Sequence, residues 1–262
     1  MPSVNEVAPP RSVHVATPRA ASDAEYETPV YKGLVIRAHP EVHEKVSEIV
    51  IARMPAAGVV LDIAAGDGAL SQRLMDFGYK VSCTSWNDRL KIRPDSNFRV
   101  NLDREFSVDD VGGMRYPCVL AVEIIEHLRN PFQFLSSVRG ILAEDGVFVL
   151  TTPNIQSALS RLQIVLRGTP RSFSDDEIIR NRHIFMPHPA VLALFLRQVG
   201  FQVVERHFLP DERRFFRGAN AIAKRLLMTL VNTVGTGDLQ GAACVYVLKA
   251  TEPMPEVQSE LY

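Results

Sequence analysis

One short stretch constrains the fold more than any other: VVLDIAAGDG, from Val59 to Gly68. Its first five residues are apolar and mostly β-branched apart from an acid at position 62, which predicts a buried strand. Two small residues and the glycines at positions 66 and 68 then allow a tight turn into a helix beginning near Ala69. In a parallel α/β sheet such a turn lies at the carboxyl end of a strand, where ligands bind. The stretch therefore predicts a strand, a nucleotide-cradling turn and a helix.

Strand-like and helix-like segments alternate along the rest of the chain. Predicted strands after the first cover 79–86, 98–102, 117–122, 147–151, 201–208 and 243–248. Helices are predicted from Pro40, from Ala69 to Gly78, from Pro131 and over 187–199, because apolar residues recur there at helical spacing. This alternation predicts fold class α/β, with a doubly wound sheet.

The chain is long enough for one domain with a full hydrophobic core. We expect a disordered tail at 1–30, the domain at 31–250, an arginine-rich lid insertion at 155–186, a basic and then amphipathic insertion at 211–240, and a polar C-terminal tail at 251–262.

Net charge and cysteine usage narrow the possible partners and compartments. The formal net charge of −1 gives no general attraction to nucleic acid or to anionic membranes. Cys83, Cys118 and Cys244 lie far apart in apolar runs, which favours buried thiols in a reducing compartment over a zinc site or disulfides. With no apolar N-terminal segment and no run of membrane-spanning length, the expected location is cytoplasmic.

The glycine turn resembles the first motif of class I S-adenosylmethionine-dependent methyltransferases, acid-x-Gly-x-Gly-x-Gly. Asp62, Gly66 and Gly68 match it, and Ala64 replaces the first glycine. The G-x-G-x-x-G spacing of dinucleotide-binding turns differs. The resemblance runs from about Pro40 to Lys249 through EIIEHL at 123–128, LAEDG at 142–146, TTPN at 151–154 and VGF at 199–201. It implies a Rossmann-like seven-stranded sheet, mostly parallel with one antiparallel strand, and S-adenosylmethionine as cofactor.

The same resemblance implies which residues contact that cofactor. Besides the loop of Asp62, Ala64, Gly66 and Gly68, the second strand of the family ends in an acid that holds the ribose hydroxyls. Ser85 occupies that position here; Asp88 either replaces the acid or belongs to an ordinary turn. Asp103 stands where the family receives the adenine amino group, and Glu123 is expected at the reactive end of the cofactor.

Glu123, Glu126 and His127 are spaced i, i+3 and i+4, so one helical turn would place them on one face after a strand. They could hold a divalent cation there; alternatively, the carboxylates are solvated and His127 only orders the loop. His183, in the lid insertion, would lie close enough to join them.

Glu-x-x-Glu-His with a distant His resembles the ubiquinone-biosynthesis O-methyltransferases and the small-RNA terminal 2′-O-methyltransferases, where such residues bind magnesium. The resemblance implies Glu123, Glu126, His127 and His183 as ligands of Mg²⁺ or another divalent cation, which would lower the pKa of a substrate hydroxyl. Mixed carboxylate and imidazole ligands also suit manganese or iron. Without a metal, His127 or His183 is the candidate general base, and Glu126 completes the catalytic set.

The acceptor is predicted less sharply. The lid arginines either bind an anionic acceptor or are ordinary surface charge: Arg161, Arg167, Arg171, Arg180 and Arg182. The insertion at 211–240 would contact a membrane surface, its own sheet or a second subunit of a homodimer. We expect O-methylation of a small-molecule, lipid-linked or sugar-linked hydroxyl. The alternatives are an RNA terminus or an amine as acceptor, or a catalytically silent binding protein, which Ala64 and Ser85 would favour.

Overall fold

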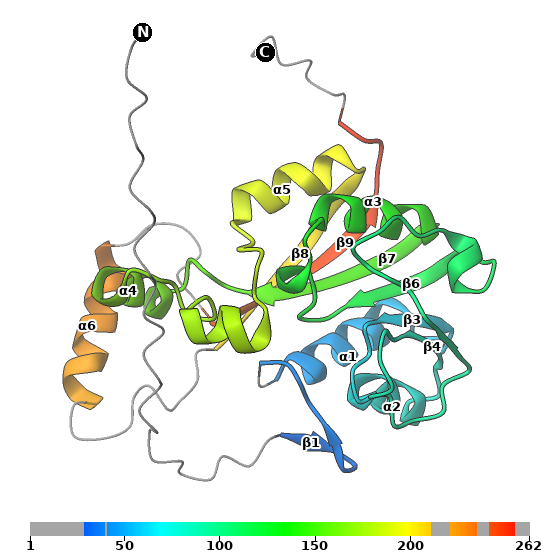
Figure 1. Ribbon diagram of the computed structural model, residues 1–262, viewed down its shortest axis with the longest axis horizontal. Helices are drawn as coiled ribbons and strands as arrows, with labels where there is room; N and C mark the ends of the chain where they lie inside the picture. The colour runs from blue at the N-terminus through cyan, green and yellow to red at the C-terminus, as the bar shows by residue number, and fades with distance from the viewer. Residues whose placement is uncertain (1–28, 40, 211–220, 235–240, 255–262) are drawn as a thin grey trace, which may run out of the picture.

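A computed structural model describes residues 29–39, 41–210, 221–234 and 241–254 (Figure 1). Most of the tail predicted at 1–30 lies outside the described residues, as do Pro40, the basic part of the second insertion at 211–220, and positions 255–262 of the C-terminal tail. The helices and strands of the described residues lie between Val30 and Ala250.

A single sheet of seven strands forms the centre of the fold, in the order β5-β4-β3-β6-β7-β9-β8. The strands are β3 (Val59–Ile63), β4 (Lys80–Thr84), β5 (Ser96–Phe98), β6 (Tyr116–Ala121), β7 (Leu142–Pro153), β8 (Phe201–Leu209) and β9 (Ala243–Ala250). β3 to β7 pair in parallel, whereas β9 runs antiparallel to both of its neighbours, β7 and β8. This confirms the predicted doubly wound, Rossmann-like sheet with one antiparallel strand.

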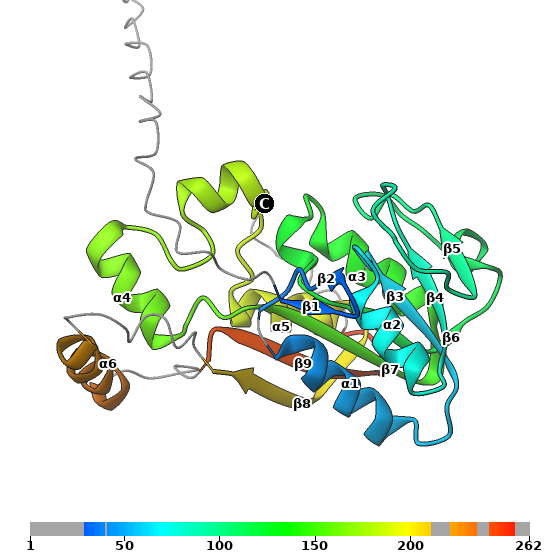
Figure 2. The same ribbon diagram turned by 90° about the horizontal axis from the view of Figure 1, so that it is seen from below.

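Helices cover both faces of the sheet (Figures 1 and 2). Side chains of α1 (Val42–Arg53) and α2 (Ala69–Asp76) pack with Val60 of β3 in one hydrophobic cluster. Side chains of α3 (Pro131–Ile141) and α5 (Pro189–Gln198) pack with Leu61 of β3 in another. Because neighbouring residues of a strand face opposite sides, a strand covered on both sides needs a continuous apolar run. That explains the run from which β3 was predicted.

Most predicted boundaries differ slightly from those in the structure, and two predicted strands differ clearly in extent. The third strand ends at Phe98 instead of beginning there, because the following residues turn in a loop where the Asn101 side chain accepts the N–H of Asp103, 3.1 Å away. β7 begins at Leu142, before the predicted 147, since its register against β6 shifts and lets Leu142 pair with Tyr116. Element type was correct in both cases, and only the extent was wrong.

The lid insertion at 155–186 is more regular than expected. It contains α4 (Ala158–Arg167) and a π-helical turn, η3 (Glu177–Asn181). The Ser157 side chain caps α4 by accepting the N–H of Ser160 at 3.1 Å. The apolar face of α4 packs on α6 (Ala221–Val234) through Val231, so its burial depends on a segment far away in the sequence. Figures 1 and 2 both show α4 and α6 side by side at one end of the molecule.

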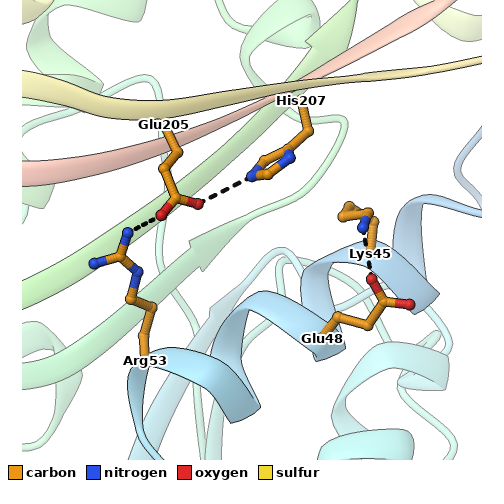
Figure 3. A network of polar contacts seen from close by, with 5 residues as sticks. All are labelled: Lys45, Glu48, Arg53, Glu205 and His207. Atoms are coloured by element: carbon orange, nitrogen blue, oxygen red, sulfur yellow. Dashed lines mark hydrogen bonds and ion pairs between the residues drawn. The ribbon is translucent and has the colours of Figure 1, made fainter.

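Polar contacts attach peripheral elements to the sheet and helices. Arg53 at the end of α1 pairs with Glu205 on β8, and His207 Nε2 lies 3.0 Å from the same carboxylate (Figure 3). In the hairpin of β1 (Val30–Tyr31) and β2 (Leu34–Val35), the Tyr31 hydroxyl donates to Asp76 on α2 at 2.7 Å. Exposed pairs of this kind contribute about 1 kcal/mol or less, so burial in the two clusters carries most of the stability. Across the described stretches, no helix is long and apolar enough to cross a membrane.

Candidate functional site

A cavity of about 1300 Å³ opens at the carboxyl ends of β3, β4 and β6. From β3 the chain continues to β4 and β5 on one side, and it returns to β6 on the other side. Such a reversal of strand order leaves a crevice in which ligands bind in open α/β sheets. The predicted site residues that line it are Ala64, Gly66, Ser85, Asp103, Glu123, Glu126, His127 and His183.

The two glycines of the turn have different roles. Gly66 has a φ of 58°, and a Cβ built on it would meet only the Arg37 Cδ, 4.0 Å away, so this position opens into the cavity. Gly68 has a φ of 93° and caps α2, and a Cβ there would lie 2.6 Å from the side chain of Ile92. Gly66 thus leaves room for a ligand, whereas Gly68 leaves room for Ile92.

Ala64, which replaces a glycine of the family motif, adopts the left-handed conformation that favours glycine, with a φ of 58°. Its N–H donates to Thr84 Oγ1 on β4 at 3.0 Å. This hydrogen bond from the neighbouring strand helps to hold the strained turn, so the alanine is compatible with the loop geometry.

The acids near the turn anchor it from inside. Asp62 is absent from the cavity lining; its buried carboxylate accepts from Ser71 on α2, and burial raises its pKa to about 6. Asp67, which the sequence analysis missed, lies 2.6 Å from Lys91 Nζ and 3.0 Å from Arg37 Nε. The pairing with Lys91, and then with Arg37, lowers the pKa of Asp67. Its position between the two glycines was the available indication.

Ser85 reaches the cavity without presenting an acid there. Its hydroxyl donates to Asn97 Oδ1 at 3.0 Å. Asp88 is exposed and does not line the cavity, and the Asn87 side chain accepts the N–H of Arg89, which favours the ordinary-turn interpretation. Trp86, also missed, lines the cavity with 58% of its surface exposed.

Asp103, for which the resemblance predicted a contact with adenine, lies at the cavity. Its carboxylate lines the cavity and accepts the backbone N–H of Arg129 at 2.7 Å. That hydrogen bond joins the loop after β5 to the segment after β6, so both sides of the cavity are held together at this point.

The predicted helical turn over Glu123, Glu126 and His127 does not form as one unit. Glu123 follows β6 with a φ of 48°, and the short 3-10 turn η2 covers only Ile125–His127. Glu123 bonds instead to Thr151 on β7 through two hydrogen bonds of 2.9 Å. The Thr151 hydroxyl donates to the Glu123 carboxylate, and the Glu123 backbone N–H donates to the Thr151 hydroxyl oxygen. Burial raises the pKa of Glu123 to about 7.

Glu126, His127 and His183 converge, each offering a potential ligand atom within 4.8 Å of the others; Glu123 stands outside this group. Glu126 is 1% exposed, and its Oε2 has no hydrogen-bond partner among the residues that the structure describes. Burial, and then the charge of Glu123, raises the pKa of Glu126 well above its usual value. The rings of His127 and His183 meet edge to face, with centroids 4.7 Å apart. A buried carboxylate oxygen without a partner is costly, so this position suits a cation or a proton.

Hydrogen bonds with the backbone hold the two histidines and the lid segment in position. His183 Nδ1 lies 2.6 Å from the carbonyl oxygen of Ser172; because a carbonyl only accepts, Nδ1 carries the hydrogen and Nε2 keeps its lone pair in the neutral ring. Burial, more than the charge of His183, lowers the pKa of His127. The N–H groups of Ile184 and Phe185 both donate to the carbonyl of Glu126 at 2.9 Å. The lid segment is therefore attached directly to η2, which brings His183 to the site.

The lid arginines divide into two sets. Arg171, Arg180 and Arg182 line the cavity, whereas Arg161 and Arg167 do not. Arg161 Nε donates to the carbonyl of Gln156 at 2.9 Å. Arginines that the sequence analysis did not single out also line the cavity: Arg37, Arg89 and Arg129.

Comparisons with known proteins agree with this geometry. The sequence model of a family described as a methyltransferase domain matches residues 37–206. No curated protein matches the chain.

Several solved structures share the fold. A SAM-dependent methyltransferase from Archaeoglobus fulgidus superimposes with a TM-score of 0.55 at 16% identity, covering 80% of this chain and 94% of that one. The CcbJ methyltransferase from Streptomyces caelestis has a TM-score of 0.53 at 17% identity, covering 82% and 91%. Magnesium protoporphyrin IX methyltransferase from Synechocystis PCC 6803, with bound SAH, has a TM-score of 0.52 at 11% identity, covering 80% and 83%. At these identities the likeness shows a shared fold.

Proposed function

The chain belongs to the family of methyltransferase domains, and we propose that it transfers a methyl group from S-adenosylmethionine to a hydroxyl oxygen. The proposed acceptor is a small-molecule, lipid-linked or sugar-linked alcohol or phenol. One observation carries this proposal: a single cavity connects the glycine turn with Glu126, His127 and His183. A ligand on the turn would extend its reactive end toward groups that can bind or deprotonate a hydroxyl.

The residues along the cavity fit the cofactor. Gly66 leaves open the space that a Cβ would fill, and Asp103 offers a carboxylate to the adenine amino group. Trp86 offers an aromatic face next to Ser85, just beyond the end of β4, and the Arg99 guanidinium lies 5.5 Å from its ring centroid. Bound S-adenosylmethionine supplies an activated methyl group and leaves as a neutral thioether. The protein's task is then mainly to position the acceptor and exclude water.

His183 is placed to accept the proton that the acceptor hydroxyl loses. Its Nδ1–H is held by the Ser172 carbonyl, so Nε2 is the basic atom. Formation of the new O–CH₃ bond releases one proton from the oxygen, and Nε2 takes it. His127, at 4.7 Å between ring centroids, is the second candidate base.

The same group fits a divalent cation, which we propose as an aid to the reaction. In this alternative to proton transfer to His183, its Nε2 would bind the cation, Glu126 would contribute the buried Oε2 that has no hydrogen-bond partner among the described residues, and His127 a ring nitrogen. A cation bound there supplies a Lewis acid that lowers the pKa of the acceptor hydroxyl. One carboxylate with two imidazoles suits manganese or iron better than magnesium, which prefers oxygen ligands. The carbonyl on His183 Nδ1 is the kind of outer contact that orients ligating histidines.

Calorimetric titration with S-adenosylhomocysteine and S-adenosylmethionine, with and without Mg²⁺ or Mn²⁺, tests the cofactor assignment. We expect micromolar dissociation constants. Transfer of a labelled methyl group to phenols, alcohols and matched amines then tests oxygen as the acceptor atom. If neither cofactor form binds under any condition, the protein is a silent binding protein on this fold. Transfer of the labelled methyl group to amines, but not to phenols or alcohols, would contradict the O-methylation proposal.

Binding of Mn²⁺ alone, followed by electron paramagnetic resonance, tests the metal proposal. Glu126→Gln should lose most of the bound Mn²⁺, because the amide keeps the shape of the side chain without its charge. Glu105→Gln is the matched control, since Glu105 is exposed and does not line the cavity. Equal Mn²⁺ affinity in the wild type and Glu126→Gln would exclude Glu126 as a ligand.

A further inference from the structure

We propose that the methyl acceptor carries an anionic group, a carboxylate or a phosphate monoester, and that Arg129 and Arg182 bind it. This inference rests on the proposed function and adds the chemical class of its substrate. The two arginines come from different segments, and in sequence both lie between His127 and His183, Arg129 close to the first histidine and Arg182 next to the second.

Both arginines are placed next to the reactive residues. Arg129 follows η2, two positions after His127, and Arg182 directly precedes His183 in the lid. Both line the cavity that contains those histidines. An anion held between them would therefore lie beside the position proposed for the acceptor hydroxyl.

Neither guanidinium is neutralised by the residues that the structure describes. Among them, no carboxylate forms an ion pair with Arg129 or Arg182. Other arginines of the cavity contrast with them: Arg37 pairs with Asp67 at 3.0 Å, and Arg180 pairs with Asp176 at 2.8 Å. Because arginine stays protonated at any physiological pH, two uncompensated positive charges border the reactive group.

The position of Arg182 is determined by the backbone on both sides of it. Its φ of 58° is uncommon for a residue with a side chain. Hydrogen bonding between its backbone and the His127 ring, together with the bonds from Ile184 and Phe185 to the Glu126 carbonyl, holds this conformation. Strained backbone persists where surrounding contacts over-determine it, and it is frequent at ligand sites. These contacts hold the backbone of Arg182 next to the two histidines.

Guanidinium groups match carboxylate and phosphate oxygens through paired N–H donors, and these charge-assisted hydrogen bonds are among the strong ones. The carboxylate of the cofactor is a less suitable occupant. It belongs to the amino acid part of a ligand on the glycine turn, where Arg37 and Lys91 already surround Asp67. Arg129 and Arg182 instead accompany the residues proposed to act on the acceptor.

Calorimetric titration with phenyl phosphate, 4-hydroxybenzoate and phenol tests the inference. The titrations are done on the full chain with and without saturating S-adenosylhomocysteine. We expect at least one anionic probe to bind about tenfold tighter than phenol or better, and the tighter of the two distinguishes a phosphate from a carboxylate acceptor. Phenol binding as tightly as both anions would overturn the inference.

Arg129→Gln and Arg182→Gln should each weaken binding of the preferred anion by about tenfold while leaving affinity for S-adenosylhomocysteine unchanged. Arg182→Lys should restore part of the affinity, since it keeps the charge and loses the paired donors. Arg167→Gln is the matched control, because this exposed arginine of α4 does not line the cavity. Thermal unfolding checks that each variant folds.

The outcomes separate the two proposals. Variants that bind the anions as tightly as the wild type overturn the role of the arginines, whatever the cofactor does. Loss of affinity for S-adenosylhomocysteine in Arg182→Gln would assign this arginine to the cofactor instead. Failure of the wild type to bind S-adenosylhomocysteine refutes the proposed function, and the titrations without it still decide whether these arginines form an anion site.

Discussion

Single residues of the glycine turn show how one motif serves both packing and binding. Gly66 faces open cavity, whereas the space beside Gly68 is filled by Ile92. The acids divide similarly, because Asp62 bonds to Ser71 inside the fold and Asp67 pairs with Arg37 and Lys91 at the turn. The neighbours in space therefore decide whether a glycine or an acid of this motif serves packing or faces the ligand.

Gly66→Ala should weaken binding of S-adenosylhomocysteine by about tenfold or more, because the added methyl group enters the ligand's space and overpacking costs about 1–3 kcal/mol. The fold should tolerate it, since Ala64 already adopts the same φ of 58°. Calorimetry measures the affinity. Gly113→Ala is the control, with a φ of 74° and no atom within 4 Å of the added Cβ. Wild-type affinity in Gly66→Ala would show that no ligand contacts this turn.

His43 should make stability depend on pH. It is buried in α1, and burial, with a smaller contribution from Arg73, lowers its pKa to about 4. Between pH 6.5 and pH 4, His43 binds a proton more readily in the unfolded chain than in the folded one. The free energy of unfolding is therefore unaffected by protonation of this residue above pH 6.5 and decreases as the pH falls below it. From pH 7 to pH 5, the wild type should lose about 2 kcal/mol more of its unfolding free energy than His43→Leu.

Urea denaturation of both proteins at the two pH values measures this difference. Asp62 acts in the opposite direction: its pKa is raised to about 6, so its contribution to stability grows as the pH falls from 6 toward 4. Because Asp62 is present in both proteins, its contribution cancels when the loss of unfolding free energy in His43→Leu is subtracted from the loss in the wild type. Equal losses in the two proteins would contradict the assignment to His43.

At the scale of elements, short connections decide how the layers meet. The lid residues bond to η2 through the Glu126 carbonyl, and β7 holds Glu123 through Thr151. The connection between α5 and β8 consists of Val199 and Gly200, and Gly200 has a φ of 84°. The N–H of Thr251, just after β9, donates to the Gly200 carbonyl at 2.9 Å. This connection therefore holds the antiparallel part of the sheet against α5.

Gly200→Ala should destabilise the protein by about 3 kcal/mol, combining overpacking with the cost of a left-handed alanine. The added Cβ would lie 2.7 Å from the Thr251 carbonyl oxygen. Gly33→Ala is the matched control: its φ is 80° and nothing lies within 4 Å of the new Cβ, so it should lose about 1 kcal/mol. Urea denaturation measures both. Similar losses in the two variants would mean that the contact with Thr251 relaxes without cost.

For the whole molecule, the burial of the three cysteines links the reactivity of their thiols to global unfolding. Cys83 and Cys118 are buried in the cluster under α1 and α2, and Cys244 is buried in the cluster under α3 and α5. No disulfide joins them, which agrees with the expectation of buried thiols. Burial raises the pKa of Cys83 and of Cys118 to about 12. The two thiols under α1 and α2 therefore contain little thiolate, and the Cys244 thiol on the other face is buried.

All three thiols should react with a thiol reagent such as 5,5′-dithiobis(2-nitrobenzoate) only as fast as the protein unfolds globally, because the thiolate is the reactive form. Absorbance at low urea concentrations should give one rate for all three, rising with the unfolded fraction. A cysteine introduced at a buried position, as in Ser82→Cys on β4, should react at the same slow rate as the native thiols. A cysteine introduced at an exposed position, as in Ser107→Cys, should react at once. Rapid labelling of a native cysteine below the unfolding transition would contradict this.

The overall fold could be predicted from the sequence to a large extent, and the site only in part. The seven strands, the glycine turn and the helix beginning at Pro131 were each indicated by local patterns or by family resemblance, and the structure contains them. The convergence of His183 with Glu126 and His127 was suggested only by resemblance. Arg129 and Trp86 had no distinguishing local pattern, although both line the cavity.

The sequence by itself determined where the chain forms strands, turns and helices, because periodicity, glycine and caps act within a few residues. Only the tertiary structure decided which side chains face the cavity. Gly66 and Gly68 have similar local sequence signals, yet Ile92 packs beside only one of them. The buried face of helix α4 packs on Val231 of α6, and Glu123 bonds to β7 instead of joining its neighbours in one turn. These outcomes depend on contacts between segments far apart in sequence, and such contacts exist only after the sheet has assembled.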